Sequence, residues 1–217
     1  MVKIKICGIT NLSDARAAVE AGADMLGFNF YRPSSRFIEP RNARGLIDTL
    51  RSGLAGLDRT VMMVGVFVNE SSPEAVQEIA DEAGVEAIQL HGNESPEFCA
   101  RLRSLSKDRF VIKVLRGDND DVVSKAVEYD VDAIMLDAFD KDLYGGTGRT
   151  IDWSIAARAC RLVSRLFLAG GLSPENVVEA INSVQPYAVD ACSALESLPG
   201  RKDTGRVRAF VRAARSG

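Results

Sequence analysis

The sequence predicts an α/β protein, a single-domain (β/α)8 TIM barrel over residues 1–217. Eight short apolar runs alternate strictly with helical patterns, which is the order of parallel strands joined by helices. A chain of 217 residues suits eight such units in one barrel. Reactive side chains follow the apolar runs, where barrel enzymes carry their catalytic groups. An open doubly wound sheet would show the same alternation and is the alternative.

The eight apolar runs are the predicted strands. Most are continuously apolar, as parallel strands buried on both faces are. They comprise residues 3–7, 25–28, 61–68, 87–90, 110–115, 133–136, 166–169 and 187–189.

The stretches between the runs carry helix signals. Ser-Pro-Glu occurs at residues 72–74, 95–97 and 173–175. This tripeptide predicts a helix with serine at the N-cap, proline at its first position and a carboxylate near its positive end. Gly22 and Gly84 each follow a helical pattern, as glycines that end helices do.

Composition limits the classes of function. Apolar residues make up 46% of the chain and charged residues 26%, as in an ordinary globular protein. The net charge is −3 and the basic residues are scattered, which argues against the basic face of a nucleic-acid-binding protein. No apolar run has the length of a membrane span, and the alternating N-terminus is unlike a secretion signal. We therefore expect a cytoplasmic protein.

Cysteine and histidine usage predicts no metal centre. The four cysteines lie far apart with no Cys-x-x-Cys pair, so free thiols are expected. His91 is the only histidine, which leaves little material for an imidazole-rich metal site. The cysteines are Cys7, Cys99, Cys160 and Cys192.

Reactive side chains gather after the predicted strands. In a barrel the C-terminal ends of all strands meet on one face, whatever their separation in the sequence. We therefore expect these side chains to form one pocket. They are Cys7, Arg36, His91, Arg116, Asp137, Gly170, Gly171 and Asp190.

Two of these residues could move protons. Cys7 is followed by Gly8, which leaves room for a ligand beside the sulfur, and a thiol of lowered pKa can act as a general base. The alternative is a small buried hydrophobe, as most free cysteines are. Asp137 directly follows a buried strand, where a desolvated carboxylic acid could donate a proton. The alternative for Asp137 is a carboxylate that only tethers its loop.

Two loops predict a phosphate site. Gly170 and Gly171 stand between a strand and a helix start, where backbone amides can approach an anion closely. The loop after the last strand would supply the other half, at a place where barrels often bind phosphate. Two tight turns without a ligand are the alternative. The second loop holds Asp190, Cys192, Ser193 and Ala194.

Three further features could contact a substrate. The Arg36 guanidinium could clamp a carboxylate with two hydrogen bonds, although most arginines are solvated surface residues. His91 could orient a substrate or only fill the barrel mouth. Residues 144–148 are glycine-rich and belong to a long connection that could cover a ligand, although any surface loop could have this composition.

Several segments carry a family resemblance. The most specific are Lys-Ile-Cys-Gly-Ile-Thr at 5–10 and Leu-Ala-Gly-Gly-Leu-Ser-Pro-Glu-Asn-Val at 168–177. The others are residues 27–36, 64–69, 89–92, 136–137, 145–148, 152–153 and 189–190. Together they resemble the phosphoribosylanthranilate isomerase family over essentially the whole chain.

The resemblance implies a ring-opening Amadori rearrangement of an N-phosphoribosyl aminobenzoate, a step of tryptophan biosynthesis. Asp137 resembles the family's general acid and Cys7 its general base. Arg36 would hold the anthranilate carboxylate, and the two loops at 170–171 and 192–194 would hold the phosphate. No metal or cofactor is implied, because the reaction moves only protons. The implied partner is this small molecule, with no nucleic acid or membrane, and the chain could be a monomer or a homodimer.

The sequence departs from the family pattern in two places. In the loop after the last strand, Cys192 replaces a hydroxyl residue and Ala194 replaces a glycine. A thiol is a weak hydrogen-bond donor and alanine disfavours a positive φ, so weaker phosphate binding is expected. Ser35 stands where proline is common, which predicts a looser loop around Arg36.

Three other interpretations remain. A histidine-pathway sugar isomerase performs the same rearrangement. That family is expected to carry a pair of aspartates at the first and fifth strands, where this chain has Cys7 and Arg116. Metal-dependent sugar-phosphate epimerases need histidine and aspartate ligands, which a single histidine does not favour. A non-catalytic barrel that binds a phosphorylated ligand is the third, and the presence of both Cys7 and Asp137 argues against it.

Overall fold

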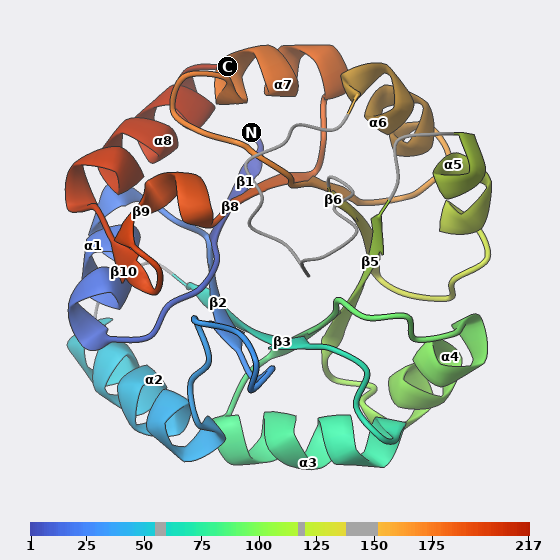
Figure 1. The fold of residues 1–217 in the computed structure, drawn as a ribbon, viewed down its shortest axis with the longest axis horizontal. Helices are drawn as coiled ribbons and strands as arrows, with labels where there is room; N and C mark the ends of the chain where they lie inside the picture. The colour runs from blue at the N-terminus through green and yellow to red at the C-terminus, as the bar shows by residue number, and fades with distance from the viewer. Residues whose placement is uncertain (55–59, 117–119, 138–151) are drawn as a thin grey trace.

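A computed structural model of the chain describes residues 1–54, 60–116, 120–137 and 152–217. Eight parallel strands form a closed barrel in the order β1 to β8, and a ring of helices surrounds it (Figure 1). The predicted (β/α)8 TIM barrel is confirmed. The open doubly wound sheet is wrong, because β8 pairs with β1 and closes the sheet.

The strands lie within two residues of the predicted bounds. Their near-continuous apolar runs are buried from both sides, by the barrel interior and by the helices. The strands are β1 Lys3–Ile6, β2 Met25–Asn29, β3 Met62–Phe67, β4 Ala87–Leu90, β5 Phe110–Arg116, β6 Ala133–Asp137, β7 Leu166–Leu168 and β8 Ala188–Ala191.

The helices that cover the barrel show most of the predicted signals. The Ser72 and Ser95 side chains accept hydrogen bonds from the amides of residues 75 and 98 and cap α3 and α4. Gly22 and Gly84 end α1 and α3 with φ of 116° and 69°. The helices are α1 Leu12–Ala21, α2 Pro40–Leu54, α3 Pro73–Ala83, α4 Pro96–Leu105, α5 Asp120–Ala126, α6 Trp153–Cys160, α7 Val177–Val184 and α8 Thr204–Ser216.

The third Ser-Pro-Glu segment does not begin a helix, so that prediction is wrong. α7 begins at Val177, and residues 174–176 form a turn before it. The Asn176 side chain closes this turn, because it accepts from the Ser173 amide at 2.8 Å and donates to the Gly171 carbonyl at 3.0 Å. An asparagine three residues after the serine therefore overrides the helix start.

A small hairpin follows β8 that the sequence did not predict. A short 3-10 helix, η1 (Ser193–Leu195), leads into β9 (Glu196–Leu198), which pairs antiparallel with β10 (Arg201–Lys202). The amide of Lys202 donates to Asp14 Oδ2 at 2.8 Å and ties the hairpin to α1. The hairpin brings two charged side chains, Glu196 and Lys202, to the mouth of the barrel.

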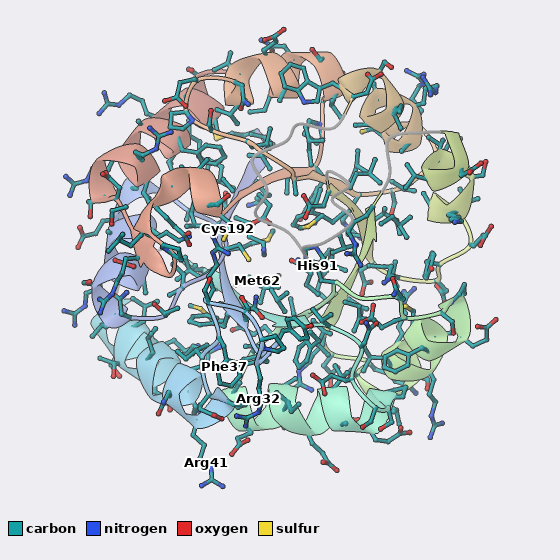
Figure 2. All side chains as sticks on the ribbon, in the orientation of Figure 1. Arg32, Phe37, Arg41, Met62, His91 and Cys192 are labelled. Atoms are coloured by element: carbon teal, nitrogen blue, oxygen red, sulfur yellow. The ribbon has the colours of Figure 1, made fainter. Side chains whose placement is uncertain are left out.

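The core has two layers. Most apolar side chains pack between the strands and the helices, and a second cluster fills the barrel interior. Side chains alternate along a strand, so a residue two positions from an inward-pointing apolar residue also points into the barrel. Near the C-terminal ends, several of these inward positions are polar, and Figure 2 shows His91 and Cys192 near the centre, whereas Arg41 lies at the outer rim. Among the described residues, no helix is long and apolar enough to cross a membrane.

Candidate active site

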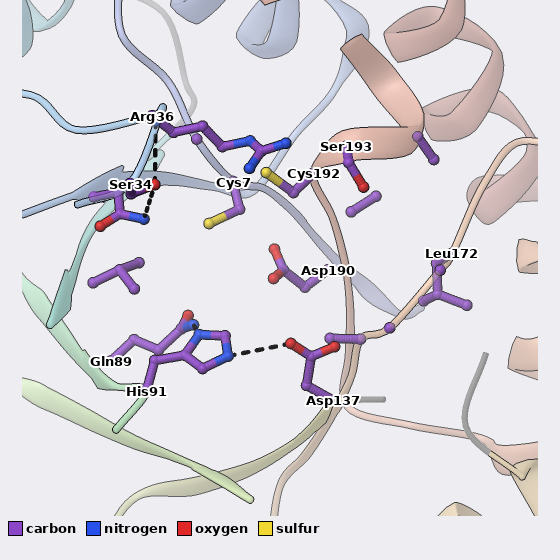
Figure 3. A pocket seen from close by; sticks show the side chains of 18 residues that line it. Cys7, Ser34, Arg36, Gln89, His91, Asp137, Leu172, Asp190, Cys192 and Ser193 are labelled. Atoms are coloured by element: carbon purple, nitrogen blue, oxygen red, sulfur yellow. Dashed lines mark hydrogen bonds and ion pairs between the residues drawn. The ribbon is translucent and has the colours of Figure 1, made fainter. Parts of the chain in front are cut away.

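A pocket opens at the C-terminal ends of the strands (Figure 3). It brings together every described residue to which the sequence analysis gave a role in catalysis or ligand binding. Arg116, which was also expected at this mouth, is outside the lining and donates to the His91 carbonyl at 3.4 Å. The assigned residues in the lining are Cys7, Arg36, His91, Asp137, Gly170, Gly171, Asp190, Cys192, Ser193 and Ala194.

The strand register explains this convergence. Ile6 is paired with Ala191, and the Cys7 amide donates to the Ala191 carbonyl at 3.0 Å. Cys7 and Cys192 therefore leave neighbouring strands side by side. In Figure 3, Asp137 lies across the pocket from Cys7 and comes from β6.

Two glycines make room for the thiol and its neighbours. A Cβ on Gly27 would lie 2.8 Å from Cys7 Sγ, so only glycine leaves the sulfur its place. A Cβ on Gly8 would lie 2.8 Å from Arg36 Cδ and 2.9 Å from Cys192 Sγ. A side chain at residue 8 would therefore meet Arg36 and Cys192, whereas Gly8 and Cys7 both line the pocket.

The surroundings of Cys7 favour its thiolate. A hydrogen bond from the Cys192 thiol holds the pKa of Cys7 well below the usual thiol range, and burial opposes this shift. The charges of Lys5 and Lys202 lower the pKa of Cys7 further. The same hydrogen bond raises the pKa of Cys192, so this residue keeps its proton. A thiolate beside buried cations is able to act as a base near neutral pH.

A buried ion pair between Lys5 and Asp190 lies beside the thiol. Lys5 Nζ is 2.9 Å from Asp190 Oδ1, and both side chains are almost fully buried. Burial raises the pKa of Asp190 to about 6, although the Lys5 charge opposes this shift. Burial alone would lower the pKa of Lys5, but the charges of Asp190 and Cys7 outweigh it and raise that pKa. Lys5 is therefore a permanent buried cation.

The opposite wall of the pocket holds Asp137 in contact with an imidazole. His91 Nε2 lies 3.2 Å from Asp137 Oδ2, and Gln89 Nε2 lies 3.1 Å from His91 Nδ1. With the amide nitrogen of Gln89 as donor, Nδ1 accepts and the ring proton sits on Nε2, facing Asp137. The side chains of His91 and Asp137 are 11% and 9% exposed, so the carboxyl group is shielded from water but reaches the pocket.

Arg36 already holds a carboxylate in the protein. Its Nε and Nη2 bind the two oxygens of Glu196 at 2.8 and 2.7 Å. Lys202 Nζ binds the same carboxylate at 3.0 Å, so two cations share one anion. Because Nε and Nη2 are used on one edge, the Nη1 and Nη2 edge of the guanidinium can still receive a ligand carboxylate.

The two phosphate loops have conformations that suit an anion. Gly170 and Gly171 have φ of 83° and 65°, which favours glycine and turns their amides outward. Within the described residues, no acceptor receives a backbone hydrogen bond from the amides of Gly171, Ser193 or Ala194. These amides line the pocket and can bind phosphate oxygens.

The concern about Ala194 is not supported. Ala194 lies inside η1 and is not among the described residues with a positive φ, so alanine is unstrained there. Figure 3 shows the Cys192 side chain near Cys7 and Arg36, and the hydrogen bond from its thiol lowers the pKa of Cys7, a contact that the sequence did not predict. The positive φ expected at Ala194 is therefore wrong, and weaker phosphate binding stays a prediction.

Four side chains of the site were missed by sequence reasoning. Lys5 carried a signal, because it is a charged residue between two buried isoleucines of β1. Gln89 carried the same signal in β4. Glu196 and Lys202 gave none, because the hairpin that presents them was not predicted.

Two further expectations concern the glycine-rich loop and a metal site. The glycine-rich residues 144–148 lie outside the described residues. In the described ranges, no group of three or more histidine, cysteine, aspartate or glutamate side chains is arranged to hold a metal ion.

The chain is similar to known proteins over its full length. Residues 4–213 match the family model of N-(5'-phosphoribosyl)anthranilate (PRA) isomerase. The N-(5'-phosphoribosyl)anthranilate isomerase of Geobacter sulfurreducens is 46% identical over 215 residues, which cover 99% of both chains.

Solved structures agree with this match. A crystal structure of phosphoribosyl anthranilate isomerase from Thermotoga maritima is 39% identical, covers 100% of both chains and has a TM-score of 0.87. A structure of the isomerase with reduced 1-(o-carboxyphenylamino)-1-deoxyribulose 5-phosphate is 38% identical, with a TM-score of 0.83 and 100% coverage of both chains.

Proposed function

The chain belongs to the N-(5'-phosphoribosyl)anthranilate isomerase family, and we propose that it performs this isomerisation with Cys7 as general base and Asp137 as general acid. The observation that carries the proposed roles is a single pocket lined by a thiol among cations and, across from it, a carboxyl group beside an imidazole. The reaction is an Amadori rearrangement that converts an aminoaldose to an aminoketose by moving protons.

The first step opens the furanose ring. Asp137 donates a proton to the ring oxygen as the bond from that oxygen to C1′ breaks, and the nitrogen lone pair forms a Schiff base. The His91 ring lies beside the Asp137 carboxyl group, with Nε2 3.2 Å from Oδ2, and limits the space open to it. Shielding from water favours transfer of the proton to the substrate and not to solvent.

The second step moves the proton at C2′. The Cys7 thiolate removes this proton. The electron pair of the C2′–H bond forms the C1′–C2′ double bond, and the Schiff-base nitrogen becomes neutral. The resulting enolamine tautomerises to the ketone. A thiolate suits this step because it is basic enough to take an activated proton and is stable among Lys5, Cys192 and Lys202.

Binding positions the sugar between these two groups. The free edge of Arg36 takes the anthranilate carboxylate, and the amides of the Gly170–Gly171 loop and of Ser193 and Ala194 take the phosphate. Two anionic anchors at opposite ends of one substrate fix its centre between Cys7 and Asp137, and orientation of this kind lowers the barrier by several kcal/mol.

The test is a turnover assay with purified protein. Anthranilate and ribose 5-phosphate, or anthranilate with phosphoribosyl pyrophosphate and its transferase, supply the substrate, and the loss of its fluorescence reports conversion. Cys7→Ser tests the proposed base. Cys160→Ser is its matched control, because it makes the same chemical change on α6, outside the pocket lining. Wild type and this control should consume the substrate at equal rates.

A negative result distinguishes the alternatives. Tight binding of the reduced, open-chain product analogue without turnover would favour a non-catalytic binding barrel. Neither turnover nor binding, with the protein folded, would favour a different phosphorylated sugar. The cytoplasmic location, the absence of a cofactor and the choice between monomer and homodimer stay predictions from the sequence.

A further inference from the structure

Lys5 is a buried charge that neither moves a proton nor binds the substrate in the reaction above. Its side chain has no exposed surface, and it stands in β1 two residues before Cys7. Residues two apart on a strand point to the same side, so both side chains enter the barrel interior. An uncompensated ammonium there would be destabilising by several kcal/mol, so its position requires an explanation.

The Lys5 ammonium faces two acidic groups. It lies 2.9 Å from Asp190 Oδ1 on β8. A Cβ on Gly27 would lie 2.8 Å from Cys7 Sγ and 3.2 Å from Lys5 Nζ, so the sulfur and the ammonium lie over the same backbone position. Glycine at residue 27 is what allows both atoms to occupy this space.

We propose that Lys5 is a positioning residue that keeps Cys7 ionised, with Asp190 as a counter-ion that offsets part of the Lys5 charge. The inference rests on the proposed function, in which Cys7 is the base. A buried ammonium acts with little screening by water, so it stabilises a neighbouring thiolate more than a surface lysine does. Asp190 is not in contact with reacting atoms in this scheme, and its negative charge opposes the effect of Lys5 on the thiol.

Other charged or titratable groups also face Cys7. The Cys192 thiol and Lys202 lie on the side of the hairpin, and Arg36 lies on the loop after β2. Asp190 opposes them with a negative charge. Lys202 and Arg36 share Glu196, which offsets part of their charge. The charged groups that act on Lys5 are Asp190 and Cys7. We therefore expect Lys5 to have a separable effect.

The chain contains a matched control for Lys5. Lys113 on β5 is also buried and forms a 2.6 Å ion pair, with Glu94, but it faces the helix layer and is remote from Cys7. Replacing either lysine with a neutral residue leaves a buried carboxylate unpaired. The charge of Lys113 acts on the Cys99 thiol and not on Cys7, so the two variants separate the loss of an ion pair from the loss of charge at Cys7.

The experiment measures the ionisation of Cys7 directly. The variants Lys5→Gln, Lys5→Arg and Lys113→Gln are alkylated with iodoacetamide across a pH series, and mass spectrometry follows the peptide that contains Cys7. Only the thiolate reacts, so the rate midpoint reports its pKa. In Lys5→Gln the midpoint should rise by at least about one pH unit, as expected when an adjacent opposite charge is lost. Lys5→Arg and Lys113→Gln should stay near wild type.

The same shift should appear in catalysis. The acid limb of kcat/KM should move upward in Lys5→Gln by the same amount, and the loss of activity at neutral pH should be recovered at higher pH. A purely structural defect would lower activity at every pH. If Lys5→Gln does not fold, Asp190→Asn gives a second test, because removing a negative charge beside Cys7 should lower its midpoint or leave it unchanged.

Three results would overturn the inference. These are an unchanged midpoint in folded Lys5→Gln, an equal shift in Lys113→Gln, and a raised midpoint in Asp190→Asn. Alkylation requires no turnover, so the result stands apart from the proposed function. If the wild type fails to isomerise the substrate, the reaction is wrong, and the effect of Lys5 on the thiol is still measured.

Discussion

Two walls of the pocket solve different chemical problems. The thiol wall consists of Lys5, Cys7, Asp190, Cys192 and Lys202, and the acid wall consists of Gln89, His91 and Asp137. The thiol wall is built from buried charges on β1, β8 and the β9–β10 hairpin. The acid wall is a chain from a neutral amide through an imidazole to a carboxyl group on β4 and β6.

The difference follows from the form in which each group must act. A base must be ionised before the substrate proton moves, so its wall supplies cations that stabilise a negative charge. An acid must hand over a proton at one place, so its wall supplies orientation through one rigid ring. If this distinction holds, variants of the two walls should fail in different ways.

The largest effect is expected for Cys7→Ser. A serine hydroxyl is a far weaker acid than a thiol, so the cations of the thiol wall do not ionise it at neutral pH. We expect kcat to fall by about 10³-fold or more. Steady-state fluorescence measures kcat, and circular dichroism checks that the fold is retained. A rate near wild type would remove Cys7 from the mechanism and end the comparison.

Asp137→Asn should follow closely. An amide keeps the shape of the acid wall but has no acidic proton for the ring oxygen, so kcat should fall by about 10²- to 10³-fold. In contrast to the thiol wall, no increase in pH should restore the rate. The measurement is kcat across a pH series. Activity that survives in Asp137→Asn would assign the acid to another group.

The pKa of Asp190 predicts a pH-dependent stability. Its folded value of about 6 lies above its usual 3.8, because burial favours the neutral acid. The stabilisation is present at low pH and is lost as the pH rises through about 6, by about 3 kcal/mol. Asp190→Asn cannot ionise, so its free energy of unfolding should fall less between pH 4 and 7. Urea titrations of both proteins test this, and parallel curves would contradict it.

Arg36 and Glu196 should affect binding more than chemistry. Arg36→Ala removes the proposed carboxylate clamp and should raise KM by about ten- to a hundredfold, while kcat changes little. Glu196→Gln loosens the guanidinium without removing it and should raise KM about tenfold or less.

A substrate made from aniline and ribose 5-phosphate is the control for both variants. It lacks the carboxylate, so the wild type and the variants should use it equally well. An unchanged KM for the normal substrate in Arg36→Ala would leave Arg36 only its structural ion pair with Glu196.

The smallest effect is expected for Ala194→Gly, which restores the family pattern. Because Ala194 has no positive φ in η1, glycine brings no relief of strain, and KM should change less than about twofold. Competition by inorganic phosphate against the substrate gives a second measure of the same loop. A large fall in KM would indicate that alanine does hinder phosphate binding.

Local sequence was sufficient for most of the fold. Continuous apolar runs predicted the strands, because parallel strands in a barrel are buried on both faces. Strand-end positions predicted Cys7, His91, Asp137 and Asp190 in one pocket, because a closed barrel brings those ends together. The start of α7 was not predictable from Ser-Pro-Glu, because the Asn176 side chain closes a turn there.

The sequence by itself determined which residues stand at the barrel mouth, since that depends on strand order and alternation along each strand. Only the tertiary structure decided their partners. Lys5 meets Asp190 across 185 residues, and Arg36 meets Glu196 across 160. Whether a strand-end cysteine is an inert thiol or a base depends on the charges beside it. Those charges arrive only when β8 closes on β1 and the hairpin folds over the mouth.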